Sequence, residues 1–167
     1  MKQKNLYLMC GVPGAGKTTW VKGQIAKATG ECRHISRDSI RFSLLSDEDD
    51  YFAKEDLVFN TFCQEIQKAI NDESVEHIFV DATHLNEKAR NKTLDKLQFD
   101  GVNLFAVNFE VSVEVCLSQN ENRRGVGRTY VPRSVIRRMA ESFVPAKMLG
   151  ERYSYNIITI KMEGDDE

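Results

Sequence analysis

Two patterns of apolar residues alternate along the chain and predict its secondary structure. Short apolar runs, typical of buried strands, occur at residues 6–10, 34–36, 77–80, 102–109 and 155–160. The segments between them predict helices at residues 17–28, 38–45, 52–71, 86–97, 112–120 and from Pro132 to about Phe143. Apolar residues recur every third or fourth position most clearly at 52–71, whereas the helix at 86–97 is polar and Ser112 can cap the helix at 112–120. Strands that alternate with helices throughout favour an α/β fold, in which helices cover both faces of a parallel sheet.

The length of the chain indicates one domain. Its 167 residues contain no internal repeat and no linker, so we expect a single domain over residues 1–167. A hydrophobic fraction of 41% and a charged fraction of 29% are ordinary for a globular protein and exclude a disordered or collagen-like chain. No apolar run approaches the roughly 20 residues of a membrane helix, and the first run is too short for a signal-peptide core. We therefore expect a cytoplasmic protein without a membrane partner.

Charge is distributed unevenly along the chain, although the net charge is only −2. Acidic runs at residues 47–50 and 163–167 are expected to form a solvated loop and an acidic C-terminal tail. Six arginines, in contrast, lie between Arg123 and Arg138 with no acid among them. The cysteines are far apart and form no C-x-x-C pair, which predicts reduced thiols without a disulfide partner. They are Cys10, Cys32, Cys63 and Cys116.

The segment between the first strand and the first helix matches G-x-x-x-x-G-K-[ST] in full. Glycines allow the backbone N–H groups of such a phosphate-binding loop (P-loop) to wrap a phosphate chain at the positive end of a helix. Lys17 is expected to reach the outer phosphates, and the Thr18 hydroxyl to bind Mg²⁺. We therefore predict ATP and Mg²⁺ as ligands. The candidate nucleotide-binding residues are Gly11, Gly14, Ala15, Gly16, Lys17, Thr18 and Thr19.

Two further acidic residues follow strands that should end at the same edge of the sheet. Asp38 follows the second strand, with Arg41 one helical turn later. Asp38 is either a general base for an attacking hydroxyl, with Arg41 holding an anionic part of the acceptor, or a helix N-cap beside a surface charge. Asp81 ends the strand at 77–80, where it would bind Mg²⁺ with Thr18 or simply begin a turn. His84 lies beside this predicted site, and the histidines show no metal-ligand spacing.

The arginine-rich segment at 122–131 contains two glycines and is interpreted as a lid. Arginines on a lid neutralise charge on the phosphoryl group that is transferred. The alternative is a solvated basic loop. Arg123, Arg124 and Arg128 are the candidate side chains.

Four stretches occur in the order GVPGAGKT, SRDSIR, VDATH and NRRGVGRTYVP. Together they resemble the 5′-polynucleotide kinase family, the kinase module of end-healing polynucleotide kinase-phosphatases, from Leu6 to about Phe143. The first motif is common to many families, whereas the Asp-x-x-Arg pair and the arginine segment before Val-Pro are more specific. No Asp-x-Asp-x-Thr phosphatase motif and no ligase lysine motif occurs. The resemblance therefore implies a P-loop kinase fold and the kinase module alone.

The resemblance implies roles on the acceptor side of the site. Asp38 would be the general base that activates a 5′-hydroxyl, and Arg41 would contact the 3′-side phosphate of the acceptor. Thr83 and His84 would lie near the acceptor nucleoside, although the family often has asparagine at the position of His84. The implied acceptor is a 5′-hydroxyl end of DNA or RNA.

The resemblance also implies roles on the donor side. Lys17 and Thr18 would bind ATP and Mg²⁺. Arg123 and Arg128 would be the two lid arginines on the donor phosphates, and Arg124 is a third candidate that can exchange roles with Arg123.

Three functions fit these features. The first is an ATP-dependent kinase of a polynucleotide 5′-hydroxyl. The second is a kinase of a small-molecule hydroxyl acceptor, because such kinases also place an Asp and an Arg after the second strand. The third is a non-catalytic, ATP-binding regulatory module, against which the intact pair of Asp38 and Arg41 argues.

Overall fold

The computed structural model describes residues 3–125 and 130–162, and within them strands and helices alternate as predicted. The strands are β1 (Asn5–Cys10), β2 (Glu31–Ser36), β3 (Val75–Asp81), β4 (Asn103–Val111) and β5 (Asn156–Met162). The helices are α1 (Lys17–Lys27), α2 (Arg37–Leu44), α3 (Glu55–Asn71), α4 (Glu87–Leu94), α5 (Val113–Glu121) and α6 (Arg133–Ser142). The predicted α/β fold is confirmed.

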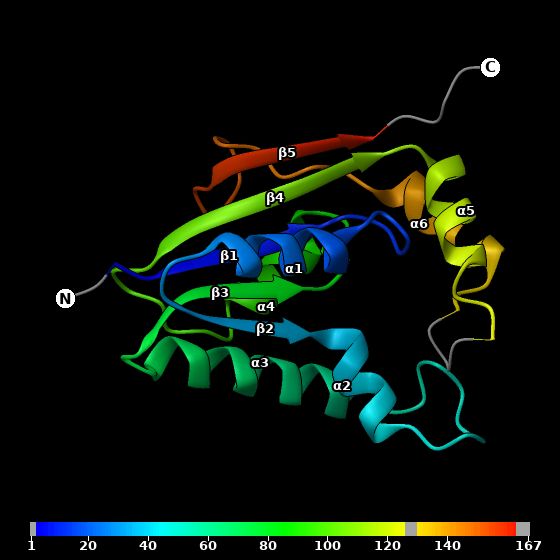
Figure 1. Cartoon of the computed structure of the whole chain (residues 1–167), viewed down its shortest axis with the longest axis horizontal. Helices are drawn as coiled ribbons and strands as arrows, with labels where there is room; N and C mark the ends of the chain where they lie inside the picture. The colour runs from blue at the N-terminus through cyan, green and yellow to red at the C-terminus, as the bar shows by residue number, and fades with distance from the viewer. Residues whose placement is uncertain (1–2, 126–129, 163–167) are drawn as a thin grey trace.

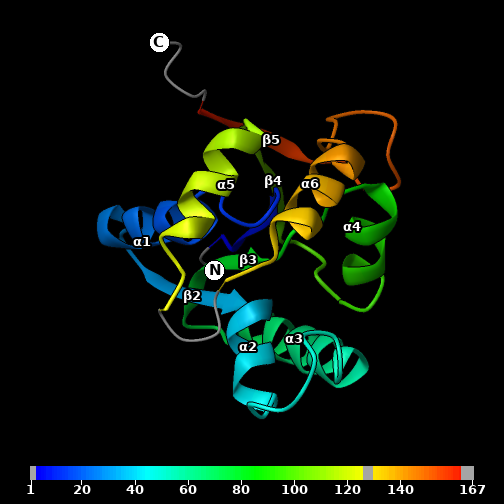
Figure 2. The same ribbon diagram turned by 90° about the vertical axis from the view of Figure 1, so that its right-hand side faces the viewer.

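The strands form one parallel sheet in the order β2-β3-β1-β4-β5 (Figure 1). In a parallel sheet all carboxyl ends lie at the same edge, and ligands bind outside that edge where the order of strands reverses. Here β1 lies between β3 and β4, and the register pairs Ser36 at the end of β2 with Asp81 at the end of β3. Figure 2 looks onto this edge, around which α2, α5 and α6 are arranged.

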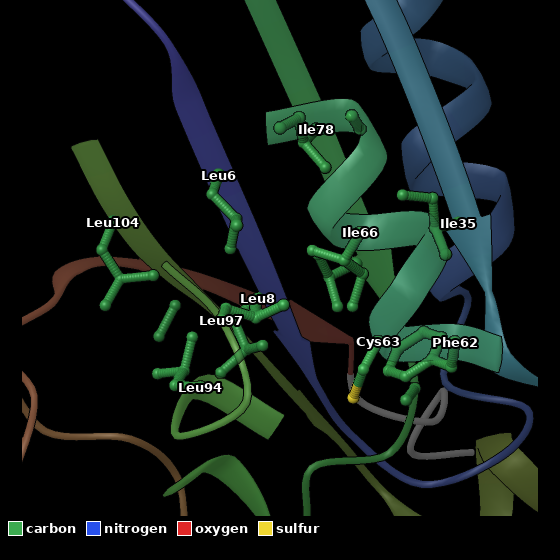
Figure 3. Close-up of a cluster of buried hydrophobic side chains, with 14 of the residues drawn as sticks. Leu6, Leu8, Ile35, Phe62, Cys63, Ile66, Ile78, Leu94, Leu97 and Leu104 are labelled. Atoms are coloured by element: carbon green, nitrogen blue, oxygen red, sulfur yellow. The ribbon is translucent and has the colours of Figure 1, made fainter. Parts of the chain in front are cut away.

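Alternate residues of the central strands face two separate hydrophobic clusters, because successive side chains of a strand point to opposite faces. Leu6 and Leu8 of β1 pack toward α3 and α4, together with Phe62 and Leu94 (Figure 3). Met9 and residues of β3 and β4 pack toward α1, α5 and α6. Helices therefore cover both faces of the sheet, as the apolar pattern predicts.

The main difference from the predicted helices is at the start of α3, which begins at Glu55 and not at residue 52. The backbone N–H of Ala53 donates to the carbonyl of Asp50 (3.0 Å), so the preceding residues form a turn. Tyr51 and Phe52 consequently lie outside the helix, on the side of the carboxyl edge of the sheet. The helix predicted at 86–97 is also shorter, since α4 ends at Leu94. Residues 94–97 form a turn closed by a hydrogen bond from Leu97 N–H to Leu94 O.

Parts of two predictions fall outside the described residues. They are residues 126–129 of the proposed lid, which include Arg128, and the acidic tail at 163–167. The single-domain interpretation of residues 1–167 and the cytoplasmic location stay predictions. Among the described helices, none is both long enough and apolar enough to cross a membrane. All four cysteines are free thiols in the structure.

Candidate active site at the carboxyl edge of the sheet

A pocket of about 510 Å³ lies at the carboxyl edge of the sheet. Its walls come from the P-loop, the start of α2, the turn before α3, the end of β3, the start of the segment after α5, and α6. It brings together eight of the residues that the sequence singled out. These are Gly14, Lys17, Thr18, Asp38, Arg41, Asp81, Thr83 and Arg123.

The P-loop has the backbone geometry that its glycines predict. Gly14 and Gly16 have φ values of 86° and 90°, in the left-handed region that favours glycine. A Cβ atom on Gly14 would also lie 2.3 Å from the carbonyl oxygen of Cys116, so no larger residue fits there. The N–H of Gly11 donates to the carbonyl of Thr83 (2.8 Å), which joins the loop to the segment after β3. Ala15 and Thr19 belong to the same turn and the first turn of α1.

Lys17 lines the pocket and is hydrogen-bonded to the P-loop itself. Its Nζ donates to the carbonyl oxygens of Gly11 (2.8 Å) and Val12 (2.9 Å). Burial lowers the pKa of Lys17, while the charges of Asp81 and Asp38 act in the opposite direction. The ammonium therefore lies within the field of both carboxylates.

Asp81 and Thr18 meet as the sequence predicts. Thr18 Oγ1 donates to Asp81 Oδ2 (3.1 Å), and His34 Nε2 lies 2.8 Å from the same oxygen. Burial disfavours the charged carboxyl, but the His34 hydrogen bond and the Lys17 charge outweigh it and hold the pKa of Asp81 below its ordinary value. Asp81 is thus an anion in the pocket.

This pair is suited to Mg²⁺, which binds to one or two protein oxygens and otherwise to phosphates and water. In the described parts of the chain, no three or more His, Cys, Asp or Glu side chains lie together as a metal site. Mg²⁺ at Thr18 and Asp81 would therefore take its remaining ligands from phosphates and water. The role of His34 was not predicted. Its contact crosses from β2 to β3, and no local spacing reveals a contact between strands that are far apart in the sequence.

Asp38 lies in the first turn of α2 but does not cap it. Ser36 is the N-cap, since its Oγ accepts from the N–H of Ser39 (3.2 Å). The side chain of Asp38 is 44% exposed and lines the pocket. The N-cap interpretation of Asp38 is therefore wrong, because a serine two positions earlier already performs that function.

Arg41 is buried, so its interpretation as a surface charge is wrong as well. Its guanidinium forms ion pairs with Asp38 and Glu55 and donates to Tyr51 Oη (2.9 Å). The ring centroid of Tyr51 is 4.2 Å from the guanidinium carbon. Glu55 also accepts from Arg37 Nη2 (2.9 Å). Arg41 is thereby the centre of a charged network beneath the pocket.

Tyr51 fixes Asp38 from a second direction. Its hydroxyl donates to Asp38 Oδ1 (2.7 Å), so the same carboxylate oxygen accepts from Tyr51 and Arg41. Burial and then the charge of Asp38 raise the pKa of Tyr51, which keeps this donor protonated. Sequence reasoning missed Tyr51 and Glu55, because they come from the turn and helix that follow the acidic loop.

His84 does not line the pocket, and its assignment to the acceptor nucleoside is wrong. It is buried, with ring contacts from Nδ1 to the Met9 carbonyl (2.8 Å) and from Nε2 to Thr93 Oγ1 (3.0 Å). Burial lowers the pKa of His84 to about 4. Its φ of 39° turns the chain after β3, which leaves Thr83 at the pocket and directs His84 into the core.

The structure separates the two neighbouring arginines of the lid. Arg123 lines the pocket, and its charge contributes to lowering the pKa of Lys17. Arg124 instead pairs with Glu121 (2.7 Å) and donates to Tyr130 Oη (2.8 Å), with its side chain 61% exposed. Arg124 is therefore not positioned to bind the nucleotide, because Glu121 and Tyr130 hold it outside the pocket.

The fold and the P-loop define a nucleotide-binding protein with a P-loop kinase-like fold. Residues 6–146 match the model of the AAA domain family, and the chain belongs to this family. A P-loop phosphotransferase is the general class that family and site support.

Several solved structures share the fold. A chain of the Pnkp1/Rnl/Hen1 RNA repair complex is 16% identical with a TM-score of 0.69, and the match covers 93% of this chain and 52% of that one. A fungal RNA kinase is 17% identical with a TM-score of 0.65, over 100% of this chain and 78% of the other. Kti12 of Chaetomium thermophilum, solved with ADP-AlF3, is 13% identical with a TM-score of 0.63, over 96% and 91%. The chain thus spans about half the length of its match in the RNA repair complex.

Proposed function

We propose that this protein transfers the γ-phosphate of ATP to the 5′-hydroxyl of a polynucleotide. The observation that carries the proposal is that the carboxylate of Asp38 opens into the same pocket as Lys17 and Thr18. A group that accepts a proton and a loop that holds phosphates are the two parts that phosphoryl transfer to a hydroxyl requires. The Asp38–Arg41 pair on the acceptor side has the spacing found in the 5′-polynucleotide kinase family, which this chain resembles.

The P-loop would hold the donor. Its backbone N–H groups and Lys17 would bind the β- and γ-phosphates of ATP, and Thr18 and Asp81 would bind Mg²⁺. When bound, Mg²⁺ neutralises charge that develops on the phosphates. Arg123 would add a second positive charge from the other wall of the pocket, and Arg128 is proposed as its partner.

Asp38 would act on the acceptor. It takes the proton of the 5′-hydroxyl as that oxygen forms a bond to the γ-phosphorus, and the bond to the β–γ bridging oxygen breaks to release ADP. Tyr51 and Arg41 hold one oxygen of Asp38, so the carboxylate keeps a single orientation during the step. Thr83 lies on the same side of the pocket and is the remaining acceptor contact that we propose.

Arg41 would serve the acceptor in two ways. It orients Asp38 in the structure, and it would bind the 3′-side phosphate of the acceptor nucleotide by exchanging Glu55 for a phosphate oxygen while it keeps Asp38. Names of similar structures, an RNA repair complex and a fungal RNA kinase, support a nucleic-acid acceptor.

A panel of acceptors tests the proposal. Labelled ATP is offered with a 5′-hydroxyl oligonucleotide, the same oligonucleotide already carrying a 5′-phosphate, and a set of sugars and other small hydroxyl compounds. We expect label only on the 5′-hydroxyl oligonucleotide. Label on a small compound and none on the oligonucleotide would contradict a polynucleotide acceptor.

A kinase of a small hydroxyl compound is the second candidate function. It is favoured by the state of Arg41, which two carboxylates already neutralise, so that the acceptor need not bring a phosphate. A gluconokinase from Sinorhizobium meliloti 1021 has the same fold, with 14% identity, a TM-score of 0.56, and a match over 96% of this chain and 84% of the other. The acceptor panel separates the two candidates. A non-catalytic ATP-binding module would label nothing.

A further inference from the structure

Phe52 is an aromatic side chain that the fold leaves uncovered at the pocket. It is 52% exposed, and it lines the pocket with Asp38 and Arg41. Exposure of a large apolar ring is unfavourable in water, because apolar surface is stabilised by burial. Its location beside the proposed general base, and not on a remote surface, makes it a candidate contact for the acceptor.

The ring of Phe52 is held by the same network that orients Asp38. It packs edge-on against Tyr51, with ring centroids 4.6 Å apart and an interplanar angle of 85°. The guanidinium carbon of Arg41 is 5.8 Å from its centroid. Because Tyr51 is itself hydrogen-bonded to Asp38, the aromatic face and the carboxylate are connected through one residue.

We propose that Phe52 is a stacking platform for the nucleobase of the acceptor nucleotide. The inference rests on the proposed polynucleotide kinase function and adds a binding group for the terminal base. A 5′-hydroxyl at Asp38 places the attached sugar at the pocket and its base beside the nearest apolar wall. Met139 of α6 also lines this pocket, so apolar atoms are available from a second element.

A flat aromatic ring can stack on the π-face of a base. Every base has a π-face, so stacking on a phenylalanine is strong but tolerant of sequence. The proposal therefore predicts an acceptor site that requires a base at the 5′ end and does not select among bases.

The test compares two acceptors that differ only in the terminal base. One is a short oligonucleotide with a 5′-hydroxyl, and the other has an abasic sugar at the same end. Stacking is worth about 1–3 kcal/mol per base, so wild-type kcat/KM should be about 5- to 150-fold higher for the acceptor with the base. Phe52→Ala should reduce this preference to about twofold or less, and Phe52→Trp should retain it.

Leu57→Ala is the matched control. Leu57 is 51% exposed in the first turn of α3 and is not among the lining residues of the pocket in the described part of the chain. Its replacement should leave the base preference at the wild-type value. ATP binding should be unchanged in all three variants, since Phe52 lies on the acceptor side.

The outcomes distinguish this inference from the proposed function. Phosphorylation of both acceptors at equal rates by the wild type would overturn the stacking platform while leaving the kinase intact, as would a base preference that survives in Phe52→Ala. Phosphorylation of neither oligonucleotide would overturn the function itself. Equal losses of the base preference in Phe52→Ala and Leu57→Ala would show that the loss does not depend on the ring at the pocket, and would also contradict the proposal.

Discussion

The two halves of the pocket that we propose for the donor and the acceptor are built in different ways. The donor half is one continuous segment, the P-loop at residues 11–18, whose shape depends on glycine φ angles and backbone hydrogen bonds. The acceptor half is a side-chain network that joins Asp38 and Arg41 of α2 to Tyr51 and Glu55. Loss of one side chain should therefore have different consequences in the two halves.

Some features of a site can be predicted from adjacent residues of the sequence, whereas others arise only on folding. A phosphate cradle made from backbone is encoded by adjacent residues. A positioned carboxylate depends on partners that another element supplies.

Apart from loss of the Asp38 carboxylate, removal of the Lys17 ammonium should have the largest effect. Lys17→Ala is expected to reduce transfer by about 10²–10³-fold, the loss typical of a positioned electrostatic group in an active site. Labelled-ATP transfer under saturating acceptor measures it. Lys22→Ala, on the exposed side of the same helix, is the control and should behave as wild type. Transfer at the wild-type rate by Lys17→Ala would show that the P-loop does not bind the donor phosphates.

Replacement of Arg41 tests whether the acceptor half does more than hold Asp38. A nucleoside 3′-phosphate should be a far better acceptor than the nucleoside, and Arg41→Ala should erase much of that preference while ATP binding persists. Arg41→Lys retains the charge but loses the planar fork of the guanidinium. We therefore expect its preference for the 3′-phosphate to be intermediate, about 10-fold below that of wild type. If Arg41→Ala slows both acceptors equally, Arg41 positions Asp38 without touching the phosphate.

Loss of the Tyr51 hydroxyl should have a smaller effect. Tyr51→Phe removes the 2.7 Å hydrogen bond to Asp38 and keeps the ring over Arg41. One such bond contributes about 0.5–1.5 kcal/mol, so kcat should fall about 2- to 10-fold with ATP affinity unchanged. Tyr153→Phe removes a similar hydrogen bond to Asp95 (2.5 Å) far along the chain and is the control. Equal kcat values for the two variants would contradict a positioning role for Tyr51.

Replacement of His84 should leave transfer at pH 7 unchanged, but it should clearly change how stability depends on pH in acid. Its pKa is lowered from 6.5 to about 4 in the folded protein, so the unfolded chain binds more protons between these values. Stability is therefore complete above pH 6.5 and is lost as the pH falls toward 4. Between pH 7 and pH 5 the free energy of unfolding should decrease by about 2 kcal/mol from this group alone.

Urea unfolding of His84→Asn at both pH values isolates that contribution. Asparagine tolerates a positive φ, and its amide can donate to the Met9 carbonyl. The variant should lose about 2 kcal/mol less than wild type between pH 7 and pH 5. An identical pH dependence for the two proteins would show that His84 does not remain neutral in the core.

The sequence predicted the sheet and the donor half because both rest on local signals. Apolar runs locate the strands, and the P-loop motif specifies Lys17 and Thr18 directly. The partnership of Thr18 with Asp81 was also predictable, because parallel strands end at one edge.

Side-chain direction and partners at long range were not predictable. His84 follows Asp81 by only three residues, yet a single positive φ directs it into the core. Tyr51 reaches Asp38 because the chain turns before α3 begins, a boundary that apolar periodicity placed three residues too early. Arg124 and Arg123 are equivalent in the sequence, and only Glu121 and Tyr130 distinguish them.

We propose that Asp38 activates the acceptor hydroxyl opposite the donor phosphates. Asp38→Asn removes the carboxylate that this role requires and keeps the shape of the side chain. The measurement is single-turnover transfer from labelled ATP to a 5′-hydroxyl oligonucleotide, with ATP affinity determined in parallel. Asp56→Asn, at an exposed position of α3, is the control. We expect Asp38→Asn to lose about 10²–10⁴-fold in transfer, with ATP binding retained, because asparagine cannot accept the proton. Transfer by Asp38→Asn at the wild-type rate would show that Asp38 is not the general base.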